Sequence, residues 1–152
     1  MNIDQALAVL EHDHVSHLTQ LCSEKDLDQL EASLGRRLPT SYRALLARVG
    51  CGILYDRHEI FGGRRLMLHD IEMVPDLLSL RARLEADGSR RWPETLVPFH
   101  RTCGVFHLLD LSGGEGPVPV TAAETGRTYP DLPDFLEAVI LSRKGSETLA
   151  AR

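Results

Sequence analysis

The sequence predicts an α+β fold in a single domain, with a mostly antiparallel sheet covered by helices. Apolar side chains recur at the helical spacing between residues 22 and 52 and again between residues 132 and 143, which indicates helices. Short apolar runs separated by glycine- and aspartate-containing turns fill residues 53–120, which indicates strands. The length of 152 residues suits one domain.

The N-terminal segment, residues 2–11, has an apolar face at helical spacing and is expected to form a helix. A polar, histidine-containing stretch follows, for which a short helical turn or loop is expected as far as Cys22. We expect residues 1–21 to be a helical extension packed on a main domain of residues 22–144. Residues 145–152 are expected to be a frayed tail.

A pair of helices is expected next. Ser23 can cap the first by accepting the N–H of Asp26, and Gly35 can end it in a left-handed conformation. The buried stripe of this helix is predicted to be Leu27, Leu30 and Leu34. Pro39 cannot continue that helix but suits the start of a second. The second stripe is predicted to be Tyr42, Leu45, Leu46 and Val49, with Gly50 closing the helix.

The middle of the chain is predicted to alternate strands, turns and one helix. Short strands are expected at residues 53–55, 59–61 and 66–68. A helix capped by Asp70, with Pro75 in its first turns, is expected to end at residues 87–88. A hairpin is expected from residues 96–100 and 105–111 around a turn at 103–104.

The C-terminal part is predicted to hold an edge strand at best in residues 117–120, after a flexible loop at 112–116. The last element is expected to be a helix of residues 132–143, with Phe135 and Ile140 on its buried face.

An ordered series of short motifs runs through these elements. Leu-Gly-x-x-Leu-Pro-x-x-Tyr leads into Gly-Cys-Gly, then Glu-Ile-Phe-Gly, Leu-Val-Pro-Phe-His and Tyr-Pro-Asp-Leu-Pro-Asp-Phe-Leu. This series resembles the SUKH superfamily of Smi/Knr-type domains, and within it the bacterial immunity-protein branch. The resemblance implies a SUKH-like single domain. Its motif residues, expected to be structural, are Leu38, Pro39, Tyr42, Gly50, Gly52, Glu59, Phe61, Gly62, Pro98 and Phe99.

Composition narrows the function classes. A formal net charge of −5 argues against nucleic-acid binding, which relies on basic side chains meeting phosphates. The sequence shows neither a long apolar run nor a basic-then-apolar leader, so no membrane association and a cytoplasmic location are expected. Arginine pairs at 36–37, 64–65 and 90–91 each lie near a turn. They would bind an acidic or phosphate-bearing partner only if they converged in space.

The sharpest candidate chemistry is the cluster His100, Cys103 and His107. Side chains alternate faces along a strand, so Cys103 and His107 are expected to share one face and His100 the other. This spacing therefore does not predict a zinc site, and the three cysteines are expected to be small buried hydrophobes rather than disulfides. No cofactor is predicted. His58 and Glu59 are likewise expected on opposite faces, and the resemblance implies that Glu59 is a hydrogen-bonding anchor.

These observations predict a non-enzymatic protein-binding domain. The resemblance implies an immunity protein that neutralises a cognate polymorphic toxin by stoichiometric binding, a basic nuclease domain being one candidate partner. Acidic loop positions expected to contact a basic partner are Asp56, Asp110 and Glu115. Two alternatives remain open: an intracellular regulatory interaction module without a toxin, and a small metal- or Cys/His-dependent hydrolase. The oligomeric state is not predicted.

Overall fold

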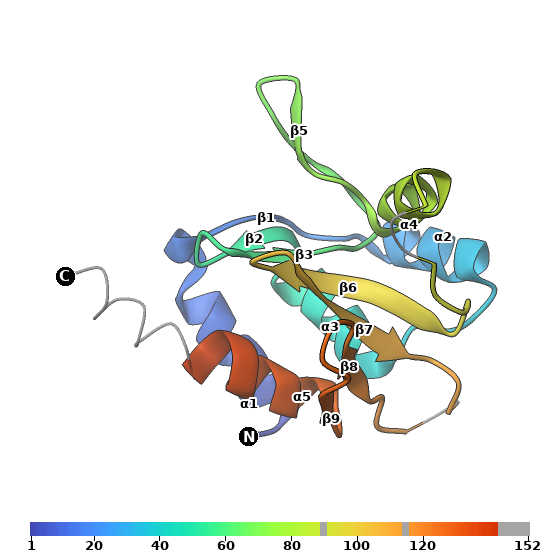
Figure 1. The fold of residues 1–152 in the computed structure, drawn as a ribbon. Coiled ribbons are helices and arrows are strands. Elements are labelled where there is room, and N and C mark those ends of the chain that lie inside the picture. The colour runs from blue at the N-terminus through green and yellow to red at the C-terminus, as the bar shows by residue number, and fades with distance from the viewer. Residues whose placement is uncertain (89–90, 114–115, 143–152) are drawn as a thin grey trace.

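The structure, a computed structural model, describes residues 1–88, 91–113 and 116–142 and has one α+β domain (Figure 1). Its main sheet has seven strands in the order β1-β2-β3-β6-β7-β8-β9, each antiparallel to its neighbours. These strands are His17–Gln20, Cys51–Leu54, His58–Ile60, Leu96–Thr102, Val105–Asp110, Val120–Ala122 and Thr128–Tyr129.

The helices are placed around this sheet. They are α1 (Ile3–His12), α2 (Glu24–Leu34), α3 (Thr40–Arg48), α4 (Leu77–Ala86) and α5 (Leu132–Phe135), with a 3-10 turn η1 (His14–Ser16) and a π-helix η2 (Leu136–Leu141) continuing α5. Figure 1 shows α1, α3 and α5 together on one face of the sheet, where they contact one another, while α4 contacts β6.

Helix ends follow the predicted chemistry. The Ser23 hydroxyl accepts the N–H of Asp26 at 3.1 Å, and Gly35 ends α2 with a φ of 68°. The last helix is confirmed over the described part of its predicted range, and its predicted end at Arg143, like the 145–152 tail, lies outside the described residues. The predicted hairpin of β6 and β7 around Cys103 and Gly104 is also confirmed.

Helix α4 begins later than predicted, and the reason lies in the preceding turn. His69 and Asp70 have φ values of 51° and 65°, the pair of left-handed residues that a tight hairpin requires. They join strand β4 (Leu66–Leu68) to a strand that was not predicted, β5 (Ile71–Val74). Pro75 disfavours a helical residue before it, so the helix starts after Asp76, whose side chain accepts the N–H of Ser79 at 2.9 Å.

Two further predictions about strands were wrong. The stretch before Cys22 was expected to be a short helical turn or loop. The turn is present as η1, but the residues after it form β1, which pairs with β2 at the sheet edge. Residues 117–120 were expected to form an edge strand at best. Instead β8 starts at Val120, after Pro117 and Pro119, which cannot donate to a strand ladder. It lies between β7 and β9, and β9 forms the edge of the sheet.

Strand β1 can approach β2 closely because β2 and its flank carry glycines. A Cβ atom on Gly50 would lie 2.4 Å from the Gln20 carbonyl oxygen, and one on Gly52 would lie 2.3 Å from that of Leu18. Both glycines also have positive φ values, 100° and 142°. The Gly-Cys-Gly motif therefore serves the contact between two backbones.

Tyr42 connects α3 to the sheet. Its side chain is fully buried, and its hydroxyl donates a hydrogen bond to the carbonyl oxygen of Phe61, just after β3. Burial raises the pKa of the Tyr42 phenol well above its ordinary value, so the hydroxyl keeps its proton. The Phe61 N–H donates in turn to the Phe99 carbonyl at 2.9 Å. These contacts hold the Leu-Pro-x-x-Tyr, Phe-Gly and Pro-Phe motifs together.

Replacement Gly52→Ala is predicted to destabilise the protein by roughly 2–5 kcal/mol, because the added methyl group meets the Leu18 carbonyl and the backbone is strained. The control is Gly104→Ala, where φ is also positive but nothing lies within 4 Å of the added Cβ. It should cost about 1 kcal/mol. Urea unfolding of both variants measures the difference, and equal losses would show that the close approach to β1 is unimportant.

Candidate functional site: buried histidines and a projecting arm

Three histidines from three strands meet inside the fold. His100 is fully buried; its Nε2 lies 3.0 Å from His58 Nδ1, and its Nδ1 lies 3.0 Å from His107 Nδ1. The rings of His100 and His107 pack against Phe135 with centroid distances of 5.0 and 4.8 Å. The cluster therefore faces the helix-covered side of the sheet, beneath α5.

The prediction that His100 and His107 occupy opposite faces was wrong. The two residues are direct cross-strand partners, and such partners lie on the same face of an antiparallel sheet. The alternation of faces cannot be counted from one strand to the next through the residues of the turn. A bulge between Pro98 and His100 adds to this, because both Phe99 and His100 contact Phe135. Cys103 stays outside the cluster. It is exposed at the tip of the hairpin, so the prediction that all three cysteines are buried was wrong for this one, because it lies in the turn between β6 and β7.

This arrangement suits packing better than catalysis. Burial, and then the neighbouring His107 and His58, hold the pKa of His100 well below its ordinary value, so its imidazole is neutral near pH 7. Within residues 1–88, 91–113 and 116–142, no group of three histidine, cysteine, aspartate or glutamate side chains could hold a metal ion.

The other two cysteines are buried, as the sequence predicted, and face each other with 3.8 Å between their sulfur atoms. The pKa of the Cys51 thiol is raised, because it is hydrogen-bonded to Cys22 and buried, so it remains a protonated, weak nucleophile. Its Sγ also lies 3.1 Å from the Arg64 carbonyl oxygen.

The predicted partner-binding acids do not form one cluster. Asp56 lies in the turn between β2 and β3, near the end of β6, whereas Asp110 pairs with Leu96 at the start of β6. At about 3.3 Å per residue, β6 separates these ends by roughly 20 Å. The Asp110 carboxylate accepts hydrogen bonds from the Ser112 hydroxyl and N–H, which lower its pKa. Glu115 lies outside the described residues.

Glu59 points away from the histidines and binds Arg101 on the neighbouring strand. Arg101 donates to both carboxylate oxygens, at 2.5 and 2.9 Å. The guanidinium also lies over the rings of Phe61 and Phe106, at 5.6 and 5.3 Å from their centroids. The pair fixes the register of β3 on β6.

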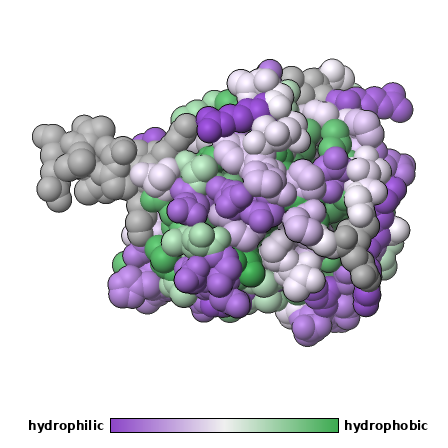
Figure 2. All heavy atoms as spheres, turned by 90° about the horizontal axis from the view of Figure 1, so that it is seen from below, coloured by the Kyte–Doolittle hydropathy of each residue, from purple (hydrophilic) through white to green (hydrophobic). Residues whose placement is uncertain are grey.

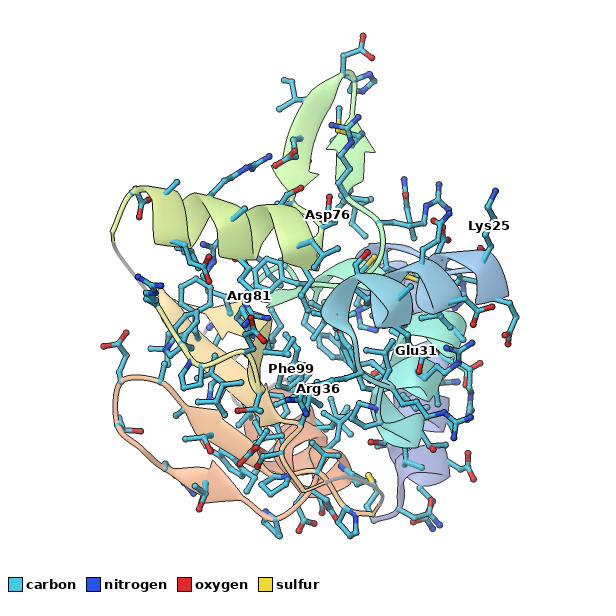
Figure 3. The ribbon with its side chains drawn as sticks, turned by 90° about the vertical axis from the view of Figure 1, so that its right-hand side faces the viewer. Lys25, Glu31, Arg36, Asp76, Arg81 and Phe99 are labelled. Carbon is cyan, nitrogen blue, oxygen red and sulfur yellow. The ribbon has the colours of Figure 1, made fainter. Side chains whose placement is uncertain are left out.

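The most conspicuous surface feature is the arm, the two-stranded sheet of β4 and β5, which projects from the body in Figures 1 and 3. Three of its apolar side chains face water: Leu68, Ile71 and Met73 are 42%, 63% and 41% exposed. Leu21, also exposed, lies near its base, where its carbonyl contacts Arg64. Sequence reasoning missed this surface because β5 was taken for a helix.

The opposite side of the molecule has a different character. Figure 2, seen from below, shows hydrophilic side chains over much of this face, with smaller apolar patches between them. None of the described helices combines the length and the apolar composition that crossing a membrane requires.

Comparison with known proteins agrees with the motifs and the fold. The model of the SMI1 / KNR4 family (SUKH-1) matches residues 21–138. The chain belongs to this family. SUKH members are generally non-enzymatic, and membership supports an immunity-protein-like binding role in general terms.

A crystal structure of a protein from Pseudomonas syringae pv. tomato is similar in fold, with a TM-score of 0.62 and 15% sequence identity. The similarity covers 91% of this SUKH chain and 98% of that one. No curated protein matches the sequence.

The histidine cluster predicts a stability that falls on acidification. The native state keeps His100 neutral, whereas the unfolded chain takes up a proton below its ordinary pKa of about 6.5, so the unfolding free energy decreases as the pH falls below that value. The slope for one proton is at most about 1.4 kcal/mol per pH unit. Urea unfolding between pH 5 and 8 measures it.

Replacement His100→Gln should remove the part of this slope that His100 contributes and leave the smaller part from His17, whose pKa burial also lowers. His12→Gln, at an exposed histidine of α1, should leave the wild-type profile in place. A wild-type slope that persists in His100→Gln would contradict the assignment.

Proposed function

We propose that this SUKH-1 chain is an immunity protein that binds a cognate bacterial toxin stoichiometrically in the cytoplasm and thereby blocks it. The observation that carries the proposal is the arm, whose exposed apolar side chains have no packing role in the core. Projecting apolar side chains are typical of surfaces that bury themselves against another protein. The generally non-enzymatic character of the family supports binding as the activity.

The positions of the buried histidines support binding because they do not suit the alternative, a Cys/His-dependent hydrolase. A hydrolase that uses His100 with Cys103 would need both groups at a place where substrate can reach them. Instead His100 lies inside the fold and Cys103 lies at the tip of the hairpin. Binding through the surface therefore accounts for these positions better than catalysis does.

The test is affinity purification of the tagged chain from its native host, followed by mass spectrometry. The expected result is one stoichiometric partner that is toxic when expressed alone and harmless when expressed with this chain. Recovery of several housekeeping proteins would favour a regulatory module instead.

The arm provides a sharper version of this test. Replacement Ile71→Asp places a charge where an apolar contact is expected, and it should weaken partner binding by about ten- to a hundred-fold. The matched control is Val15→Asp, at an apolar residue that is 84% exposed in η1, beyond the other end of β1. Isothermal titration with the captured partner measures both. Unchanged affinity in Ile71→Asp would exclude the arm from the interface.

The predicted acidic contacts are tested separately, because Asp56 and Asp110 lie at opposite ends of β6. Replacement Asp56→Lys should slow association with a basic partner by about three- to ten-fold at low salt, since attraction between opposite charges speeds encounter. Asp110→Lys is expected to do the same only if the interface reaches the start of β6. Stopped-flow association rates at two salt concentrations measure both, and rates that do not respond to either replacement would contradict a basic partner.

A further inference from the structure

A groove opens where the α2–α3 loop faces the loop after β7 and the start of α5. It encloses about 1060 Å³, more than the roughly 300–1,000 Å³ of a small-molecule site, and so has room for several residues of another chain. We call it the α3 groove. Its lining comes from four segments of the chain: the start of α1, residues 28–43, residues 111 and 116–118, and the start of α5. In Figure 3, Arg36 lies between Glu31 of α2 and the β6–β7 side of the molecule.

The floor of the α3 groove is apolar and rigid. Leu38, Leu111 and Val118 are buried core side chains whose edges reach the lining. Prolines line it as well, at positions 39, 117 and 133. A proline ring fixes φ and carries no N–H donor, so these walls offer apolar contact without competing hydrogen bonds. Such a floor is suited to apolar side chains of an extended segment.

The acidic side chains of the lining are already engaged. Arg43 makes ion pairs with Asp28 at 2.9 Å and with Glu31 at 2.5 Å. The Asp131 carboxylate accepts the N–H of Asp134 at 2.9 Å and caps α5. These carboxylates therefore have partners before any ligand arrives.

Two basic side chains of the lining, in contrast, remain available to a ligand. Arg36 and Arg37 are exposed, and neither guanidinium makes an ion pair or a side-chain hydrogen bond with any residue that the structure describes. Beside them α3 begins after Pro39, which provides no side-chain cap, so its first N–H groups add a partial positive charge. A helix end alone attracts any anion. The two guanidiniums and the apolar floor restrict which anion fits.

From this combination we propose that the α3 groove binds an acidic peptide segment in an extended conformation. Its carboxylates would meet Arg36 and Arg37, and its apolar side chains would lie on the floor. A single-stranded nucleic acid fits less well, because none of the described lining side chains is aromatic and bases need such surfaces for stacking. The α3 groove shares no residue with the arm, so this site goes beyond toxin binding and does not depend on it.

Fluorescence anisotropy with labelled peptides tests the proposal. The probe is a peptide of three Pro-Glu-Leu-Glu repeats, and its counterpart has lysine in place of every glutamate. We expect the acidic peptide alone to bind, and to bind more weakly as salt is added. The double variant Arg36→Glu with Arg37→Glu should weaken binding at least about ten-fold, which corresponds to about 1.4 kcal/mol.

The matched control is Lys25→Glu with Arg91→Glu, which changes the net charge equally at exposed positions outside the α3 groove. It should bind like the wild type, as should Ile71→Asp in the arm. Equal weakening in both double variants would show that only the net charge of the protein affects peptide binding, and it would overturn the proposal. So would binding of the lysine peptide, binding of an oligothymidine but not the acidic peptide, or no binding of the acidic peptide. Circular dichroism confirms that each variant is folded.

Discussion

The hydrogen bond from the Tyr42 hydroxyl to the Phe61 carbonyl is the contact on which the rest of the structure depends. It joins α3 to the sheet at the point where β3 ends, inside the core. Phe61 also donates its N–H to the carbonyl oxygen of Phe99 on β6, so both of its backbone polar groups are held by hydrogen bonds. Gly62 follows, and a Cβ there would lie 2.7 Å from a Leu46 methyl group. Helix, strand and glycine therefore fit together only in this register, and a lost donor would leave a buried carbonyl at a cost of about 1–3 kcal/mol.

Local chemistry accounts for the elements that could be predicted from the sequence. The cap by Ser23, the left-handed Gly35 and the β6–β7 hairpin all depend on residues close together in the chain. Strand β1 does not, since its four residues show no clear alternation of apolar and polar side chains. It forms because Gly52 of β2 and the flanking Gly50 admit its backbone. Strand β5 was missed for another reason: the predicted helix cap was Asp70, so residues 71–74 were assigned to the helix that in fact starts after Asp76.

The candidate sites divide in the same way. The pairing of His100 with His107 depends on cross-strand register and on a bulge, neither of which can be counted along a single strand. The α3 groove depends on side chains from four separate segments. Its arginine pair was visible in the sequence, but the engagement of nearby acids by Arg43 was not. Which charged side chains remain without an ion-pair partner depends on the three-dimensional arrangement, and it cannot be read from the net charge of the sequence.

The arm has a consequence for how such a protein changes over generations. Leu68, Ile71 and Met73 lie mostly outside the buried cluster that the helices and the main sheet share. Substitutions there change the shape and polarity of the surface at little cost to the free energy of folding, since surface changes rarely exceed about 0.5 kcal/mol. The exposed apolar surface of the arm and the core that stabilises the fold thus consist of separate residues. The exposed side chains of the arm can therefore vary between related sequences, while Tyr42 and the residues it holds together tolerate few substitutions.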